Sequence, residues 1–318
     1  MAPLGLSALR KLLRPRHRPQ PWAPPEASWS RAFGLGWDHP YTVRYASNLD
    51  DGPWHGMPLG GFGAGNISRS SRGDFNLWHL DGGEHWYGTI PDCQFAFWES
   101  DGSSQRSHAL ATAPEQDASR PDAERPLNAW SWYPASSASE STGTYAARYP
   151  LSWTNYTGVF AAEITCEAFS PILPGDYQRT SFPVAVFRWQ LRNPTDQPLE
   201  LSLLLSWRNT VGWFTNTDAA AEVHFRDDGS PEHNYAPAIG RGEGQRNRQV
   251  DQPGLSGVLL EGQPSVPLAE GEGQWCLALP DDLDGVQVMR CSRWDPTGDG
   301  SELWTPFAAD GRIPDSNH

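Results

Sequence analysis

Residues 185–207 read AVFRWQLRNPTDQPLELSLLLSW, and this stretch decides the fold class. Apolar and polar residues alternate on both sides of the turn-forming run 193–196, Asn-Pro-Thr-Asp. Alternation with a period of two gathers the apolar side chains on one face of a strand. The stretch therefore predicts a β-hairpin whose apolar faces hold Ala185, Phe187, Trp189 and Leu191 before the turn and Leu199, Leu201, Leu203, Leu205 and Trp207 after it.

Similar strand signals recur on either side of this segment. Residues 159–168 alternate in the same way, and short apolar runs at 95–98, 275–279 and 286–290 predict further strands. The 29 prolines and 31 glycines divide the chain into short segments without convincing helical periodicity. Many short strands between such turns predict an all-β fold, an antiparallel β-sandwich. Two stretches poor in strand signals, 101–141 and 218–272, are predicted to be long surface loops.

Charge and composition limit the partners and the location of the chain. A net charge of −14 disfavours nucleic acid, whose backbone selects basic surfaces. Residues 1–27, rich in Arg and Pro, predict a flexible basic arm ahead of one domain at 28–318, and contact with anionic lipid is an alternative role for this arm. No apolar run approaches the ~18 residues of a membrane span, and residues 1–20 lack the apolar core of a secretory signal. We expect a cytoplasmic protein with at most peripheral membrane contact.

The cysteines and histidines do not predict a metal or cofactor. Cys93, Cys166, Cys276 and Cys291 are far apart, which favours buried free thiols over a zinc site. No third ligand is spaced to join His79 and His85.

The most unusual composition lies at 56–65, where five of ten residues are glycine. So many glycines allow backbone with positive φ and close approach of another chain or a ligand. A phosphate loop is not supported, because Asn66 stands where the dinucleotide fingerprint needs glycine and no Gly-Lys-Ser/Thr follows. The aromatic and polar residues that come next suit a sugar better.

Tryptophan, with 16 copies, can stack its ring on a sugar while carboxylates and histidines bind the hydroxyls. Most of the tryptophans, including Trp189, Trp207 and Trp275 on strand faces, are expected in the core. The predicted substrate contacts surround an acidic turn: Trp78, His79, Asp81, Glu84, His85 and Trp86. Glycoside hydrolysis needs two suitably spaced carboxylates. Asp81 and Glu84 are more simply explained as a turn that caps itself, so no catalytic residue is predicted.

Three segments are distinctive when taken together. They are residues 56–80, with Pro-Leu-Gly-Gly-Phe-Gly-Ala-Gly at 58–65 and Arg-Gly-Asp-Phe at 72–75; residues 168–177, followed by Ser-Phe-Pro-Val at 181–184; and residues 187–193 with Ser-Trp-Arg-Asn at 206–209. Together they resemble the bile-acid β-glucosidase or non-lysosomal glucosylceramidase family, glycoside hydrolase family 116. The similarity extends from about Tyr41 to Arg312, and residues 41–51 and 81–85 look more like bacterial members, cyanobacterial ones included, than animal ones.

The resemblance implies an N-terminal β-sandwich that packs on a helical (α/α)₆ catalytic barrel in a retaining β-glucosidase. It also implies substrates that include glucosylceramide, and catalytic carboxylates that belong to the barrel. The sequence predicts no such helical domain here, and the sandwich is expected to be truncated before its last strands.

Two interpretations therefore stand at this point. The first is a non-catalytic N-terminal portion that supports the catalytic barrel and its pocket rim, with the barrel and a β-glucoside or glycolipid as partners. The alternative is a stand-alone carbohydrate-binding module that uses the tryptophans and the acidic turn.

Overall fold

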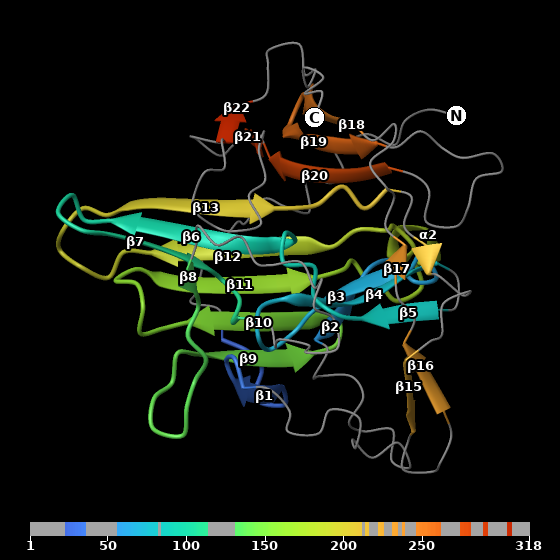
Figure 1. Ribbon diagram of the computed structural model, residues 1–318, viewed down its shortest axis with the longest axis horizontal. Coiled ribbons are helices and arrows are strands. Elements are labelled where there is room, and N and C mark those ends of the chain that lie inside the picture. Colours follow the sequence, from blue (N-terminus) through green and yellow to red (C-terminus); the bar gives the residue numbers. More distant parts are fainter. Residues whose placement is uncertain are drawn as a thin grey trace.

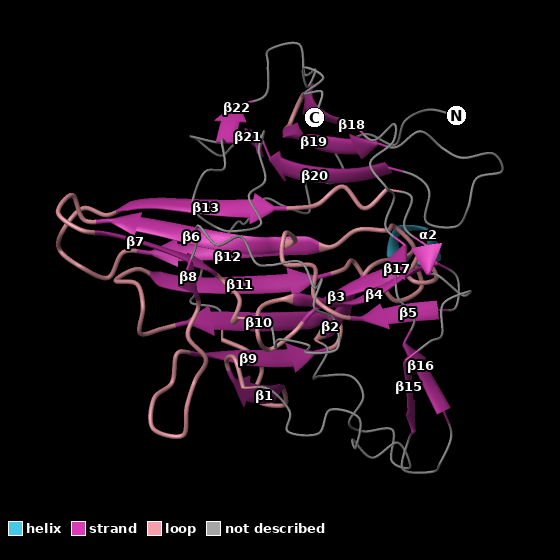
Figure 2. Cartoon of the chain, viewed as in Figure 1, coloured by secondary structure: helices cyan, strands magenta, loops and turns pink. Residues whose placement is uncertain are grey.

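The structure of the chain, a computed structural model, is almost entirely β. It describes residues 23–35, 56–81, 84–113, 131–211, 214–215, 222–225, 231–234, 237–238, 246–261, 274–280, 289–291 and 304–306. Within these ranges the one helix is the short α2 (Tyr177–Thr180), and the other regular elements are strands (Figures 1 and 2). The described chain therefore has the predicted all-β, sandwich-like architecture.

One layer is a five-stranded antiparallel sheet with the order β1-β9-β10-β11-β12. Its strands are β1 (Trp29–Ala32), β9 (Gly143–Arg148), β10 (Leu151–Tyr156), β11 (Glu163–Phe169) and β12 (Val186–Arg192). The alternation predicted at 159–168 appears in β11, where Ile164, Cys166 and Ala168 are buried in or against the core. The strand begins at Glu163, later than the sequence pattern does.

Two four-stranded sheets contribute to the opposite layer. One has the order β13-β6-β7-β8 and contains β6 (Gln94–Ser100), β7 (Gln105–Ala109), β8 (Ser131–Trp132) and β13 (Glu200–Ser206). The other has the order β2-β3-β4-β5 and contains β2 (Met57–Leu59), β3 (Asn66–Arg69), β4 (Phe75–Asp81) and β5 (Glu84–Tyr87). Phe187 of β12 contacts Phe75 of β4 and Phe95 of β6, so the two layers meet across these rings.

Smaller sheets complete the described chain. They are formed by β14 (Phe214–Thr215) with β17 (Pro237–Ala238), β15 (Glu222–Phe225) with β16 (Pro231–Asn234), β18 (Arg246–Gln252) with β19 (Leu255–Glu261) and β20 (Gln274–Pro280), and β21 (Met289–Cys291) with β22 (Trp304–Pro306). The three-stranded sheet is attached through Asn209, whose Nδ2 donates to Asn247 Oδ1 at 2.9 Å and to the Glu261 carbonyl at 3.0 Å.

The predicted hairpin at 185–207 is wrong, although both of its strands exist. β12 pairs with β11 in one sheet, whereas β13 pairs with β6 in another. The predicted turn does form, since Asn193 Oδ1 accepts from the Thr195 N–H at 2.9 Å. A connection between layers lets both apolar faces point into one core, whereas a hairpin would leave both on one side of a single sheet.

The two predicted loops also contain strands. β7 and β8 lie within 101–141, and β15 to β19 lie within 218–272. β7 has the polar sequence Gln-Arg-Ser-His-Ala, so its place in the sheet comes from backbone pairing with β6 and not from apolar periodicity. The β18–β19 hairpin turns at Pro253-Gly254, where Gly254 has φ of 94°.

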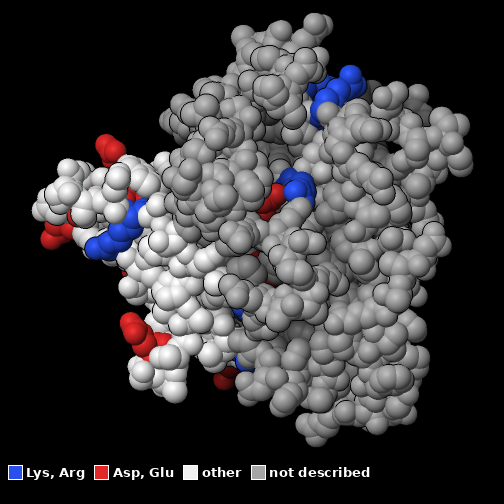
Figure 3. All heavy atoms as spheres, in the orientation of Figure 1, with Lys and Arg blue, Asp and Glu red and all other residues white. Residues whose placement is uncertain are grey.

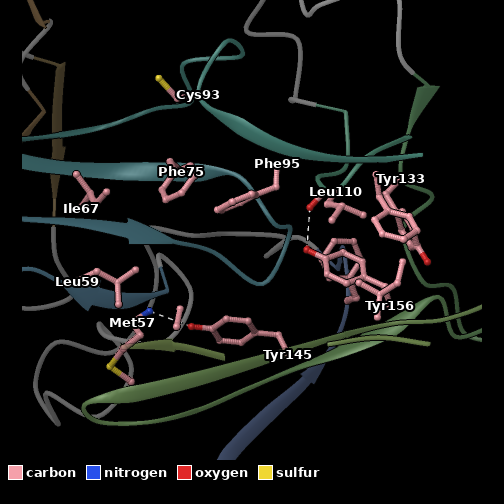
Figure 4. Close-up of a cluster of buried hydrophobic side chains, with 14 of the residues drawn as sticks. Met57, Leu59, Ile67, Phe75, Cys93, Phe95, Leu110, Tyr133, Tyr145 and Tyr156 are labelled. Atoms are coloured by element: carbon pink, nitrogen blue, oxygen red, sulfur yellow. Dashed lines mark hydrogen bonds between the residues drawn. The ribbon is translucent and has the colours of Figure 1, made fainter. Parts of the chain in front are cut away.

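The core is rich in aromatic rings (Figure 4), and the described part of it also holds the buried cation of Arg69. Tyr145 accepts a hydrogen bond from the Met57 N–H at 2.9 Å, and Tyr156 donates to the Leu110 carbonyl at the same distance. The Arg69 guanidinium, 3 % exposed, faces the rings of Phe95 and Trp189. These contacts join β2 and β3 to the five-stranded sheet.

The cysteine prediction is confirmed in part. Cys93 and Cys166 are buried and form no disulfide, while Cys276 also forms none but is exposed. The Cys291 side chain lies outside the described residues. Trp189 and Trp207 pack against the core as predicted.

Candidate functional site

The predicted sugar-contacting residues lie on the β4–β5 hairpin. Trp78 stands opposite Trp86 across the two strands, and Asp81 stands opposite Glu84. Asp81 ends β4 and Glu84 begins β5, so the acidic turn of the sequence is the tip of this hairpin. The backbone register thus places the two acidic residues directly opposite each other. The side chains of Asp81 and of residues 84–87, which include His85 and Trp86, lie outside the described part.

Trp78 is a core residue, and its prediction as a sugar-stacking ring needs correction. The side chain is 0 % exposed, and its Nε1 donates to the Gly88 carbonyl at 2.9 Å. The ring packs on Trp207 at 5.7 Å and on Phe75 at 6.4 Å between centroids. A ring enclosed in this way offers no face to a pyranose, because stacking needs an exposed surface. A bulge in β4 between Trp78 and Asp81 separates this buried position from the hairpin tip.

His79 and Asn66 are cross-strand partners beside the glycine-rich loop. His79 is half-buried, and its backbone comes so close to the loop that a Cβ on Gly65 would lie 2.7 Å from the His79 carbonyl oxygen. Gly65 also has a left-handed φ of 74°. Glycine is therefore required at this position by both space and conformation.

The glycine-rich loop (residues 60–65) is fixed to a distant segment of the chain. The Gly60 N–H donates to Ser170 Oγ at 2.7 Å, and the Phe62 N–H donates to the Thr180 carbonyl at 2.9 Å. A Cβ on Gly61 would lie 2.5 Å from the carbonyl oxygen of Phe182. The close approach expected from the glycines is thus made by the protein's own backbone at 180–182. At the loop tip, by contrast, a Cβ on Gly63 would meet open space.

The partner segment, residues 170–184, is itself held by polar contacts. Thr180 Oγ1 accepts from the Leu173 N–H at 2.9 Å, and Ser170 Oγ donates to the Val184 carbonyl at 2.9 Å. Asp176 caps α2 by accepting from the Arg179 N–H at 3.0 Å, and this bond is the first cause of the lowered pKa of its carboxyl group. The two segments are hydrogen-bonded to each other at one end of the molecule, near α2 in Figure 1.

Sequence reasoning missed the side chains that this end exposes. Phe62 and Tyr177 are 66 % and 75 % exposed. For Phe62 the sequence did carry a signal, because this aromatic residue stands between two glycines, Gly61 and Gly63, where no strand or helix is expected to bury it.

The buried carboxylates of the described chain are engaged in structural contacts. Four buried carboxylates have partners: Asp74 accepts from Ser70 and Thr89, Glu99 from the Ala161 and Ala162 N–H groups, Glu167 from Trp153 and Arg188, and Glu261 from Arg246 and Arg248. Burial raises the pKa of Tyr145, Tyr156 and Cys166 to about 12, so these groups remain protonated at neutral pH. The described core therefore stabilises the fold and holds no poised acid–base pair.

Residues 56–318 match the family model described as beta-glucosidase 2, glycosyl-hydrolase family 116, N-terminal part. The chain belongs to glycosyl-hydrolase family 116. The family-116 region begins at Gly56, the first residue of the glycine-rich segment, and includes the partner segment and the strands of both layers except β1. The sequence resemblance is confirmed by this match, and the bacterial origin stays a prediction.

Proposed function

We propose that this chain is the non-catalytic N-terminal portion of a retaining β-glucosidase that acts on glucosylceramide-like β-glucosides. In this proposal the sandwich supports a helical catalytic barrel and contributes loops to the rim of its pocket. The observation that carries the proposal is the match of residues 56–318 to the N-terminal part of family 116. Retention needs a nucleophile and an acid/base carboxyl about 5–5.5 Å apart, which the proposal assigns to the barrel.

The geometry of the described acids supports a structural role for this portion. The buried carboxylates accept hydrogen bonds from backbone, serine, threonine, tryptophan or arginine donors. A carboxyl that protonates a leaving group must be able to reach the glycosidic oxygen, and these groups are committed elsewhere. Asp81 and Glu84 remain proposed substrate contacts, together with His79, His85 and Trp86, on the hairpin beside the glycine-rich loop.

The proposed partners are the catalytic barrel and a β-glucoside or glycolipid. The net charge of −14 disfavours nucleic acid. On the face in Figure 3, the described basic and acidic side chains are scattered in small groups without one dominant sign. Within the described ranges no helix is long and apolar enough to cross a membrane. We propose a cytoplasmic location, with any membrane contact peripheral and made through the basic arm.

In the alternative, a carbohydrate-binding module, Trp78 cannot stack on a sugar because its ring is enclosed in the core. Such a module would have to bind the sugar through the tip of the β4–β5 hairpin. It predicts saturable binding of methyl β-glucoside to this chain alone. Weakening of that binding by Glu84→Ala would favour the alternative, and no binding at millimolar ligand would count against it.

The proposed function is tested on the complete polypeptide of the source locus that contains this chain. Purified enzyme is given 4-nitrophenyl β-glucoside, and the anomer released first is followed by proton NMR; glucosylceramide in mixed micelles is assayed in parallel. The proposal expects β-glucose as first product and release of ceramide. Release of α-glucose would contradict retention, and failure to hydrolyse glucosylceramide would contradict the substrate assignment.

A further inference from the structure

Exposed apolar side chains gather on the two segments joined at the glycine-rich loop. We call Phe62, Tyr177, Phe182 and Val184 the docking patch. Their exposed fractions are 66 %, 75 %, 42 % and 38 %. Outside the patch, the large hydrophobic residues found exposed in the described ranges are Leu35, Tyr149, Leu191 and Leu279, which come from four separate places in the sequence. An exposed apolar cluster of this kind usually marks an interaction site.

The docking patch is held in shape by backbone contacts between its two segments. The Phe62 N–H donates to the Thr180 carbonyl at 2.9 Å, and the backbone of Gly61 lies against that of Ser181 and Phe182. The Val184 N–H donates to the Phe182 carbonyl at 2.8 Å. A surface fixed before binding loses little conformational entropy when a partner covers it.

The chemistry of the docking patch favours a protein over a sugar or a lipid headgroup. The polar side chains around it are used internally: Ser181 Oγ donates to the Tyr177 carbonyl at 2.7 Å, and Ser170 Oγ bonds Val184. The Arg179 guanidinium is paired with Asp176, so this cation is neutralised. A sugar site needs convergent polar groups, and an anionic headgroup needs unpaired cations. An apolar, neutral surface with a hydrogen-bonded backbone matches another packed protein domain.

We propose that the docking patch is the surface on which the catalytic portion of the same family-116 polypeptide packs, with Phe62 inserted at the centre of the contact. The inference rests on the proposed function. The family match is to an N-terminal part, so a family-116 enzyme has a further portion to cover such a surface, and both segments of the patch lie inside the matched region. Open space around Gly63 leaves the loop tip free to enter a recess of the partner.

Hydrogen–deuterium exchange tests the location of the contact. The complete polypeptide of the source locus is compared with the 318-residue chain alone, peptide by peptide. We expect exchange at residues 61–65 and 177–184 to be at least about tenfold slower in the complete polypeptide, because a domain interface suppresses local opening. Equal exchange in both, or protection confined to residues elsewhere, would overturn the proposal. Slowing that appears in the isolated chain as its concentration rises would assign the patch to a second copy and would also overturn it.

Matched variants test the role of the side chains. Phe62→Ser and Tyr177→Ser in the complete polypeptide are expected to return exchange at 177–184 toward the rate of the isolated chain. Leu279→Ser, which removes an apolar side chain of 42 % exposure from β20, is the control and should leave this exchange unchanged. If both patch variants exchange like the parent, the patch is not the docking surface.

Hydrolysis of 4-nitrophenyl β-glucoside by the same samples distinguishes failure of the docking proposal from failure of the proposed function. An active complete polypeptide with an unprotected patch would overturn the docking surface and leave the proposed function standing. An inactive complete polypeptide would overturn the proposed function, and the docking assignment would be lost with it.

Discussion

The backbone N–H of Gly60 donates to the hydroxyl oxygen of Ser170 at 2.7 Å, across 110 positions of the sequence. Ser170 in turn donates to the Val184 carbonyl at 2.9 Å and is 3 % exposed. One buried hydroxyl thus connects the glycine-rich loop, the start of the partner segment and its end. The two most distinctive segments of the sequence therefore form a single structural unit.

Ser170→Ala should loosen this unit. The substitution leaves the Gly60 N–H and the Val184 carbonyl without their partner, and an unpaired buried polar group costs about 1–3 kcal/mol. We expect the free energy of unfolding in urea to fall by about 2 kcal/mol, with faster amide exchange at 60–65. Ser139→Ala, at an exposed serine, is the control. Equal stability of the two variants would show that the Ser170 bonds contribute nothing.

Two glycines of the loop should respond differently to alanine. A Cβ on Gly61 would lie 2.5 Å from Phe182 O, so Gly61→Ala must push the two segments apart. At Gly63 the space is open and the cost is only the left-handed φ of 75°, about 1–2 kcal/mol. Gly61→Ala should therefore speed exchange at 177–184, while Gly63→Ala should lower the melting temperature without that effect. The reverse pattern would contradict the close approach.

Arg69 should tolerate methionine better than lysine. Its Nη2 donates to the Leu110 carbonyl at 3.0 Å, but Tyr156 OH also donates there, so this acceptor keeps a partner when Arg69 is replaced. Methionine fills the apolar space and removes a buried charge, whereas lysine keeps the charge with fewer contacts. We expect Arg69→Lys to cost about 3 kcal/mol and Arg69→Met about 1 kcal/mol, measured by urea unfolding. If Arg69→Lys were more stable than Arg69→Met, the positive charge itself would be needed at this position.

His108 should make stability depend on pH. Burial, with the nearby Arg106 charge, lowers the pKa of His108 below its usual 6.5. The unfolded state then binds the proton before the folded state does, so stability present above pH 6.5 should decline as the pH falls through the folded pKa. His108→Phe keeps a ring against Phe160 and should reduce the slope of unfolding free energy below pH 6.5. An unchanged slope would mean that other groups cause it.

The strands with apolar alternation could be predicted from the sequence, but their partners could not. β12 and β13 were both recognised by their alternating faces, yet they pair in different sheets. Alternation reports which face of a strand is buried and does not report which neighbour it bonds. β7, with its polar sequence, could not be found in this way because backbone pairing alone places it.

The predicted sugar contacts stay a prediction, except for Trp78, which the structure places in the core. The glycines at 56–65 allow close approach of another chain segment or a ligand, and the structure identifies the backbone at 180–182 as a segment that lies there. Trp78 is followed by glycine and acidic residues, which suggest exposure, whereas its ring is enclosed in the core and the bulge in β4 lies between it and the hairpin tip. The exposure of Tyr177 depends on the placement of the four-residue α2, which no periodicity predicts.

The most direct test of the account is a paired assay with 4-nitrophenyl β-glucoside. One sample is the purified 318-residue chain, and the other is the complete polypeptide of the locus at equal molarity. The account predicts no turnover by the chain and β-glucosidase activity in the complete polypeptide. Turnover by the chain alone, lost on Glu84→Gln, would place catalysis in the sandwich and contradict the central claim, as would a complete polypeptide without activity.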